Sequence, residues 1–165
     1  MDEPKPIEVI LRPFAPADDA EVSSWFEDAG ELRFFAGRRL RWPLDSAQWD
    51  DIRSDPTVTS LTGVVGDDPT PVVHVELVAH SATLVELARF AVSPKLRAHG
   101  VGRATMPLVL VIGREAGYSR IFLEVHRDNT NAILAYRTFG FELAGDSEAA
   151  DRLRMEIHLD APADS

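Results

Sequence analysis

The fold is indicated first by one stretch, Arg97-Ala98-His99-Gly100-Val101-Gly102. A strand-like run, Thr83 to Val92, precedes it, and a helical pattern from about Val101 to Ala116 follows it. Glycines let backbone N–H groups approach a ligand without a Cβ atom in the way. A helix N-terminus adds unpaired N–H donors and partial positive charge. The stretch therefore predicts a glycine loop that suits a pyrophosphate.

Two better-known phosphate loops do not match this stretch. A Walker A loop needs Gly-Lys-Ser/Thr, which is absent after Gly102. The dinucleotide fingerprint needs a third glycine and lies after the first strand of its fold. A plain turn between a strand and a helix accounts for two glycines equally well, so the loop alone does not identify a ligand.

A second block downstream completes a recognisable pair. It reads Asn129-Thr130-Asn131-Ala132-Ile133-Leu134-Ala135-Tyr136-Arg137-Thr138-Phe139-Gly140-Phe141. With the loop, it resembles the GNAT superfamily of acyl-CoA-dependent N-acetyltransferases. The loop is similar to that family's R/Q-x-x-G-x-G/A signature after a strand that ends near Val and Pro. The second block is similar to its N-x-x-A-x-x-x-Y-x-x-x-G-F pattern, and the resemblance covers Thr83 to Phe141.

The resemblance implies both the fold and the reaction. The expected fold is α/β (α+β): one domain, residues 1–165, with a mixed, mostly antiparallel sheet of about six to seven strands and helices on both faces. The expected activity is transfer of an acetyl group from acetyl-CoA, as co-substrate, to an amine acceptor. A homodimer is expected from the family only.

The resemblance also implies a set of residues that bind acetyl-CoA. Backbone groups of the loop should hold the pyrophosphate, and the edge of the preceding strand should pair with the pantetheine arm and offer a main-chain N–H near Val92 to the thioester oxygen. Asn129 should hydrogen-bond near the pantetheine, and Tyr136 should lie by the sulfur as a general acid. The cofactor-binding residues so implied are Phe90, Ala91, Val92, Arg97, Ala98, His99, Gly100, Val101, Gly102, Arg103, Asn129 and Tyr136.

Three positions carry a second interpretation or depart from the pattern. Without the resemblance, Tyr136 is a core aromatic, since it shares helical spacing with Ala132 and Phe139. Ala98 stands where the family often has glycine, which an alanine tolerates at negative φ. Pro107 lies inside the helix after the loop, where it removes one hydrogen bond and favours a kink.

The reaction also needs a group that deprotonates the amine. An ammonium of pKa about 10.4 costs roughly 4.6 kcal/mol to deprotonate at pH 7, so a base is useful. Glu86 is the candidate because it lies six residues before Val92, where some family members carry a glutamate. If Ser81-Ala82 is a two-residue turn, Glu86 faces Leu77, and apolar neighbours would favour its role as a base. A surface glutamate, or one paired with an arginine, is the alternative.

Other side chains are weaker candidates for the base. His74 and Glu76 share a strand face that also carries Arg89 in this register, which favours a cross-strand ion pair. His99 in the loop and His126 after a strand are further candidates. The segment Arg33–Trp42, basic and aromatic, either orients an acidic group on the acceptor or forms a solvated helix face.

Composition restricts the other functions. The chain has no cysteine, so disulfides, thiolate metal sites and a cysteinyl acyl-enzyme are excluded, and direct transfer in a ternary complex is expected. The five histidines have no metal-ligand spacing, which predicts no metal. A net charge of −10 argues against nucleic acid and keeps the protein soluble. No apolar run is long enough to span a bilayer, and the start of the sequence lacks the pattern of a secretory signal. Both observations predict a cytoplasmic protein that does not associate with a membrane.

Two further functions stay open: a non-catalytic acyl-CoA-binding or sensing module, and a phosphate-binding regulatory domain without CoA.

Periodicity and capping residues predict the elements around the two blocks. The remaining predicted strands are Glu8–Pro13, Thr57–Val65, Pro71–His80, Arg120–Val125, Phe141–Ala144 and Arg152–Leu159, and the remaining helices are Asp18–Glu27, Leu44–Arg53 and Asn129–Phe139. Asp45 or Ser46 is expected to cap the second of these helices and Asn129 the third. Gly117 and Gly140 are expected to end the helices that precede them.

Overall fold

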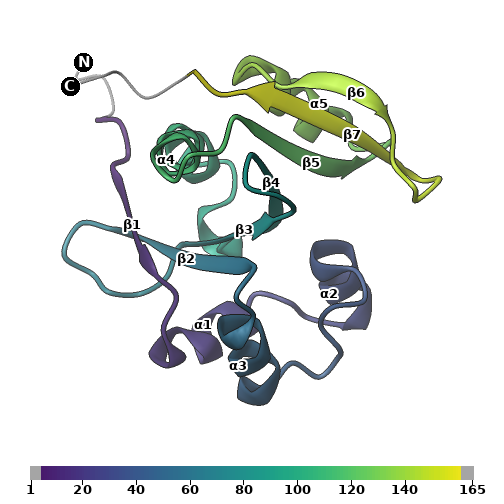
Figure 1. Cartoon of the computed structure of the whole chain (residues 1–165). Coiled ribbons are helices and arrows are strands. Elements are labelled where there is room, and N and C mark those ends of the chain that lie inside the picture. The colour runs from purple at the N-terminus through teal and green to yellow at the C-terminus, as the bar shows by residue number, and fades with distance from the viewer. Residues whose placement is uncertain (1–4, 161–165) are drawn as a thin grey trace. The chain divides into compact units, whose positions relative to one another are not determined.

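Residues 5–160 are described by a computed structural model (Figure 1). Its strands are β1 (Val9–Pro13), β2 (Val58–Val65), β3 (Val73–Ala79), β4 (Leu84–Val92), β5 (Arg120–His126), β6 (Glu142–Asp146) and β7 (Arg152–His158). Its α-helices are α1 (Asp19–Ser23), α2 (Ala29–Ala36), α3 (Ser46–Ser54), α4 (Val101–Glu115) and α5 (Thr130–Thr138), with short 3₁₀ turns η1 (Pro16–Asp18) and η2 (Pro94–Leu96).

The strands form one mixed sheet in the order β1-β2-β3-β4-β5-β7-β6. β1 pairs antiparallel with β2, and β7 pairs antiparallel with both β5 and β6. β4 and β5 are parallel, with Leu84–Glu86 opposite Arg120–Phe122. A parallel pair needs a crossover connection, and α4 lies in the chain between these two strands. The expected mixed, mostly antiparallel sheet of six to seven strands is confirmed.

The described residues fall into two compact units. The first contains the chain up to Leu77 together with Arg89–Thr105, and the second contains Val78–Ala88 together with the chain from Met106 on.

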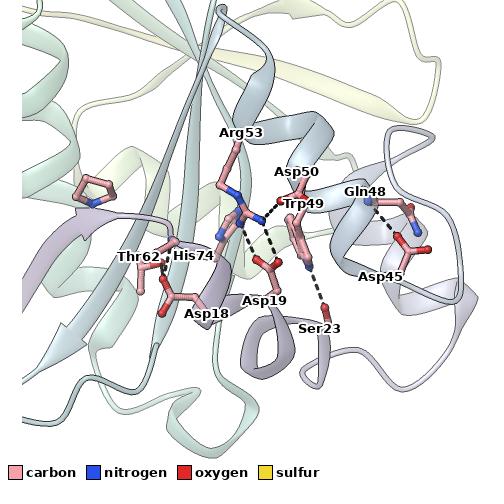
Figure 2. Close-up of polar contacts among 12 residues, drawn as sticks. Asp18, Asp19, Ser23, Asp45, Gln48, Trp49, Asp50, Arg53, Thr62 and His74 are labelled. Atoms are coloured by element: carbon pink, nitrogen blue, oxygen red, sulfur yellow. Dashed lines mark hydrogen bonds and ion pairs between the residues drawn. The ribbon is translucent and has the colours of Figure 1, made fainter.

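An aromatic-rich core packs the helices of the first unit. The buried residues of this core are Phe14, Val22, Trp25, Phe26, Leu32, Ala36, Leu40, Trp49 and Ile52. Polar contacts join α1 and α3 at its edge (Figure 2): Trp49 Nε1–H donates to the Ser23 hydroxyl at 2.9 Å, and Arg53 donates to both oxygens of Asp19 at 2.6 and 2.9 Å.

Caps determine where two of these helices begin. Asp45 is the N-cap of α3 and accepts from Gln48 N–H at 3.0 Å, which confirms the predicted start (Figure 2). The sequence analysis missed α2, although its cap follows the same rule. Asp28 accepts from Glu31 N–H, while Glu31 accepts from the Glu27 N–H, both at 2.8 Å. An acidic cap followed three residues later by glutamate is a known sequence signal for a helix start.

In the second unit, β5 lies between the parallel strand β4 and the antiparallel strand β7. Gly113 of α4 lies close to β5: an added Cβ would meet Ile121 Cδ1 at 2.9 Å, so a larger residue there would require the Ile121 side chain to shift. Gly117 and Gly140 follow α4 and α5 at φ +94° and +104°, in the left-handed conformation that ends helices. Both predicted helix stops are confirmed.

Two local predictions need correction, and the kink expected at Pro107 stays a prediction. The helix expected over Asp18–Glu27 is split into η1 and the short α1, because the chain turns after Ser23 with Ser24 and Trp25 N–H groups bonded to preceding carbonyls. The expected two-residue turn is wrong: β3 ends at Ala79 and β4 begins at Leu84, and the backbone N–H groups of His80 and Ser81 both bond to the Leu84 carbonyl. α4 continues through Pro107 as one assigned helix.

Candidate active site

The loop between β4 and α4 is a series of tight turns that starts at a buried serine. Ser93 is buried, and its N–H donates to the Val72 carbonyl at 2.8 Å. Leu96 N–H then donates to the Ser93 carbonyl at 2.9 Å, and His99 N–H to the Leu96 carbonyl at 3.2 Å. Residues Arg97–Gly100 are exposed, so the loop presents its backbone to solvent at the start of α4.

The start of α4 has the properties of an anion cradle. The N–H groups of the first helical turn, residues 101–103, have no acceptors inside the helix. Gly100 has φ +85°, and no atom lies within 4 Å of the place where its Cβ would stand. Exposed Lys95, Arg97 and Arg103 add positive charge next to these donors. The residues present therefore fit a pyrophosphate, both in shape and in charge.

Ala98 does not meet the condition expected of it. Its φ is +65°, in the left-handed region where a Cβ is crowded and glycine is preferred. The negative φ at which an alanine would be tolerated is therefore not adopted. Together with Gly100, Ala98 gives the exposed loop two residues at positive φ.

The end of β4 lies under the first turn of α4. An added Cβ at Gly102 would lie 3.6 Å from Phe90 Cε1 and 3.7 Å from Val92 Cγ2. Phe90 and Val92 therefore share the face of β4 that meets α4, while Ala91, between them, packs against the aromatic core. The structure brings together the strand edge and the loop that the sequence analysis assigned to one ligand.

Glu86 lies on β4 within the second unit, opposite Phe122 of β5. Its Oε1 is 2.8 Å from His80 Nε2, and the Glu86 side chain is 24% exposed. The His80 ring packs edge-on against Phe122 at 4.9 Å between centroids. A carboxylate only accepts, so His80 donates from Nε2–H. The surroundings of Glu86 thus include a polar partner, and the sequence analysis missed His80 because it assumed a shorter turn.

Asn129 and Tyr136 lie on α5, also in the second unit. Asn129 is the N-cap and its side-chain oxygen accepts from Ala132 N–H at 3.2 Å, which confirms the predicted cap. Tyr136 is half-buried, and its ring packs edge-on against the buried Phe141 at 5.8 Å. Burial raises the pKa of the Tyr136 phenol above its ordinary value of 10.0. The phenol is therefore protonated at neutral pH, as a proton donor must be.

The alternative candidates for the base occupy different surroundings. Glu76 is ion-paired with Arg89, which confirms the expected cross-strand pair, and His74 is hydrogen-bonded to Glu76. His99 is exposed. His126 lies 3.8 Å from each of two exposed aspartates, Asp128 and Asp151.

The described residues contain neither a cluster of metal ligands nor a helix that could cross a membrane. Among residues 5–160, no three or more His, Cys, Asp or Glu side chains are grouped so that they could hold a metal ion. Over the same part of the chain, every helix is too short or too polar to cross a membrane.

Comparison with known proteins gives a consistent family. The profile of the acetyltransferase (GNAT) family matches residues 19–141, well over half of the chain. Spermidine N-acetyltransferase from Vibrio cholerae, solved in complex with CoA and spermine, superposes with a TM-score of 0.77 over 92% of this chain and 96% of its own, at 15% sequence identity. A likeness at this identity concerns the fold.

Two relatives are closer in sequence over shorter stretches. Nourseothricin acetyltransferase is 33% identical over 64% of this chain and 68% of its own, with a TM-score of 0.53. An uncharacterized protein of Mycobacterium leprae (strain TN) is 43% identical over 60 residues, which are 36% of this chain and 16% of that protein. The chain thus matches only a small part of that relative's length.

Proposed function

The chain belongs to the GNAT family of acetyltransferases, and on that premise we propose that it transfers the acetyl group of acetyl-CoA to a primary amine of a small molecule or a protein. Acetyl-CoA is the co-substrate of this proposal, and the whole chain acts as one acetyltransferase domain. The observation that carries it is the exposed cradle at the start of α4, with Gly102 next to Phe90 and Val92.

The proposed roles divide between binding and proton transfer. Backbone N–H groups of Arg97–Arg103 hold the pyrophosphate, which needs neither a metal nor a lysine in the loop. The edge Phe90–Val92 pairs with the pantetheine arm, and a main-chain N–H near Val92 donates to the thioester oxygen as negative charge develops there. Asn129 donates from its side-chain amide near the pantetheine.

Direct transfer follows from the absence of cysteine and balances without an acyl-enzyme. The Glu86 carboxylate takes a proton from the acceptor ammonium, and the free amine nitrogen bonds to the acetyl carbon. As the carbon–sulfur bond breaks, the departing thiolate takes a proton from the Tyr136 phenol, and the phenolate takes the second proton that the nitrogen loses as the amide forms. His80 donates to Glu86 at 2.8 Å, which orients the carboxylate.

The test of this function is an acceptor screen that measures free CoA. Full-length protein is incubated with acetyl-CoA and a panel of alkylamines, polyamines, aminoglycosides, amino acids and peptides with free N-termini. Steady release of CoA with any amine supports the enzyme. Calorimetric binding of acetyl-CoA without release supports a non-catalytic acyl-CoA-binding module. Binding of nucleotides but not of acetyl-CoA supports a phosphate-binding domain instead.

Three broader expectations stay predictions. The protein is expected in the cytoplasm, without a nucleic-acid partner. A homodimer is expected, and sedimentation equilibrium at several protein concentrations would measure it.

A further inference from the structure

Glu76 holds an unusual position for a carboxylate. It lies on β3 with 0% of its side chain exposed. Both of its oxygens are used: Arg89 of β4 donates from Nε to Oε1 and forms an ion pair with the same oxygen through Nη2, and His74 lies with Nε2 2.7 Å from Oε2. The three side chains form one buried cluster within the first unit.

Aromatic rings close the cluster on the side of His74. The ring of His74 packs against Phe14 at 4.6 Å and Trp49 at 5.2 Å between centroids. Because a carboxylate accepts only, His74 donates from Nε2, and its Nδ1 has no hydrogen-bond partner within the described part of the chain. Rings exclude water here, which strengthens the attraction between Arg89 and Glu76.

The ionisation of Glu76 follows from its partners. Burial of the carboxylate opposes its charge, but the hydrogen bonds from His74 and Arg89 and the charge beside them outweigh burial, so the pKa of Glu76 lies below its ordinary value. Glu76 is therefore a weak base that already has two donors. Its position suits holding a partner better than accepting a proton from a substrate.

The partner that Glu76 holds has a strained backbone. Arg89 has φ +43° in the middle of β4, a conformation that a residue with a Cβ rarely adopts. The cost corresponds to about a five- to thirty-fold bias against it in an equilibrium constant. Such residues persist where the surrounding structure holds them and are frequent at functional sites.

The strained residue stands directly before the edge assigned to acetyl-CoA. A left-handed residue within a strand changes which face the following side chains take. Beyond Arg89, Phe90 and Val92 face Gly102 of α4, and Ala91 faces the aromatic core. A regular strand conformation at Arg89 would change the direction of the backbone that follows and turn the N–H groups of the edge.

We propose that Glu76 is a positioning residue, whose buried carboxylate holds Arg89 in the left-handed conformation and thereby sets the backbone of Phe90–Val92 for the thioester arm. The significance for acetyl-CoA rests on the proposed function, whereas the effect on the backbone does not. Replacing a buried ion pair by apolar residues is often neutral for stability, so a role in geometry explains the pair better than a role in stability alone.

The test uses Glu76→Gln, and Glu76→Gln combined with Arg89→Gly, in the full-length protein. Two quantities are measured: amide hydrogen exchange of Phe90 and Val92 without ligand, and the affinity for acetyl-CoA. Glu76→Gln should speed exchange and weaken binding, each by about tenfold, the size of the bias at Arg89. The double variant should return both to within about threefold of wild type, because glycine adopts positive φ without an ion pair.

Asp19→Asn is the matched control. It breaks another ion pair of the first unit, in which Asp19 is nearly buried against Arg53 (Figure 2). It should lower thermal stability but leave exchange at Phe90 and Val92 within about twofold of wild type.

Each remaining outcome is decisive. Unchanged amide exchange in Glu76→Gln overturns the proposal. A loss of protection and affinity that adding Arg89→Gly does not restore also overturns it, since such a loss would reflect stability alone. If Glu76→Gln does not fold, a folded double variant with wild-type exchange supports the proposal and an unfolded one overturns it. If wild type binds no acetyl-CoA while exchange responds as expected, the proposed function fails and the role of Glu76 in the backbone stands.

Discussion

Gly102 lies in the first turn of α4 directly against Phe90, where an added Cβ would stand 3.6 Å from Cε1. That distance is an ordinary van der Waals contact, so Gly102→Ala should fold and retain binding. Gly102→Leu should abolish acetyl-CoA binding, because the larger side chain would press against Phe90 and Val92 and displace the strand edge from the loop. Calorimetry on folded variants measures this. Unchanged affinity in Gly102→Leu would mean that the loop is a structural turn only.

Replacing Gly100 tests the same loop, but through the conformation of its backbone. Its φ is +85° and the space around it is open, so a bulky residue meets no protein atom and instead strains the loop by about 1–2 kcal/mol. Gly100→Leu should therefore abolish acetyl-CoA binding and also lower the melting temperature. Equal melting temperatures for wild type and Gly100→Leu would contradict the strained backbone.

Ala98→Gly should stabilise the protein. Glycine removes the crowding at φ +65°, worth about 1–2 kcal/mol, and loses about 0.4–1 kcal/mol through the greater freedom of the unfolded chain. The expected net gain in the free energy of unfolding is about 0.5–1 kcal/mol, measured by urea denaturation. Ala104→Gly, within the helical part of α4, is the control and should destabilise by about 1 kcal/mol. A loss in both variants would argue against strain at Ala98.

Glu86→Gln should lower kcat by about 10²–10⁴ if Glu86 is the general base. The loss should shrink at high pH, where the acceptor amine is already free. Rates over a range of pH, with one acceptor, measure this. Glu124→Gln is the control, since it removes a charge from the neighbouring strand β5 and should leave kcat nearly unchanged. A small loss that is uniform over pH would assign deprotonation to bound water or another side chain.

Tyr136→Phe should reduce kcat clearly, with thermal stability and acetyl-CoA affinity nearly unchanged, because only the hydroxyl is lost and the ring still packs on Phe141. All acceptors should be affected alike, since the lost proton goes to the sulfur. The pKa of the phenol is raised, so the acid stays protonated and its contribution should persist up to about pH 10. Normal turnover by Tyr136→Phe, with unfolding of Tyr136→Ala, would identify a core aromatic.

Asp18→Asn should destabilise the first unit in a pH-dependent way. Burial opposes the charge of Asp18, but hydrogen bonds from Arg12 at 2.7 and 2.8 Å and from Ala15 N–H at 2.9 Å lower its pKa overall. A lowered pKa stabilises the fold above the unfolded value of about 3.9 and loses this effect as pH falls through the folded value. We expect a loss of about 2–3 kcal/mol near pH 7.

The loss of unfolding free energy in Asp18→Asn should become smaller below about pH 4. Denaturation curves at several pH values would measure it. Asp50→Asn is the control: Asp50 also pairs with an arginine, at 2.6 Å from Arg53, but its side chain is 65% exposed. An exposed pair contributes about 0–1 kcal/mol. A loss in Asp18→Asn that stays constant from pH 7 to pH 3 would show that the charge of Asp18 is not what matters.

Elements with local signals were predicted well from the sequence. The start of α3 at Asp45 and the ends of α4 and α5 at Gly117 and Gly140 depend on a cap or a left-handed glycine within a few residues, which a sequence displays directly. The two turns that were misjudged are also held by local hydrogen bonds, but they carry no cap or left-handed glycine that marks them. The loop from β3 to β4 is longer because His80 and Ser81 both bond to Leu84, and no turn residue in Ser81-Ala82 reveals that choice.

By itself, the sequence determined the family, the mixed sheet, the glycine loop before α4 and the pairing of Glu76 with Arg89, because each rests on residue types at short spacing. Only the tertiary structure decided the burial of Glu76, the left-handed backbone of Arg89 and Ala98, and the contact between Glu86 and His80. Burial depends on what packs over a side chain, and backbone strain depends on contacts that outweigh local preference. Both are properties of the packed protein rather than of any short stretch of its chain.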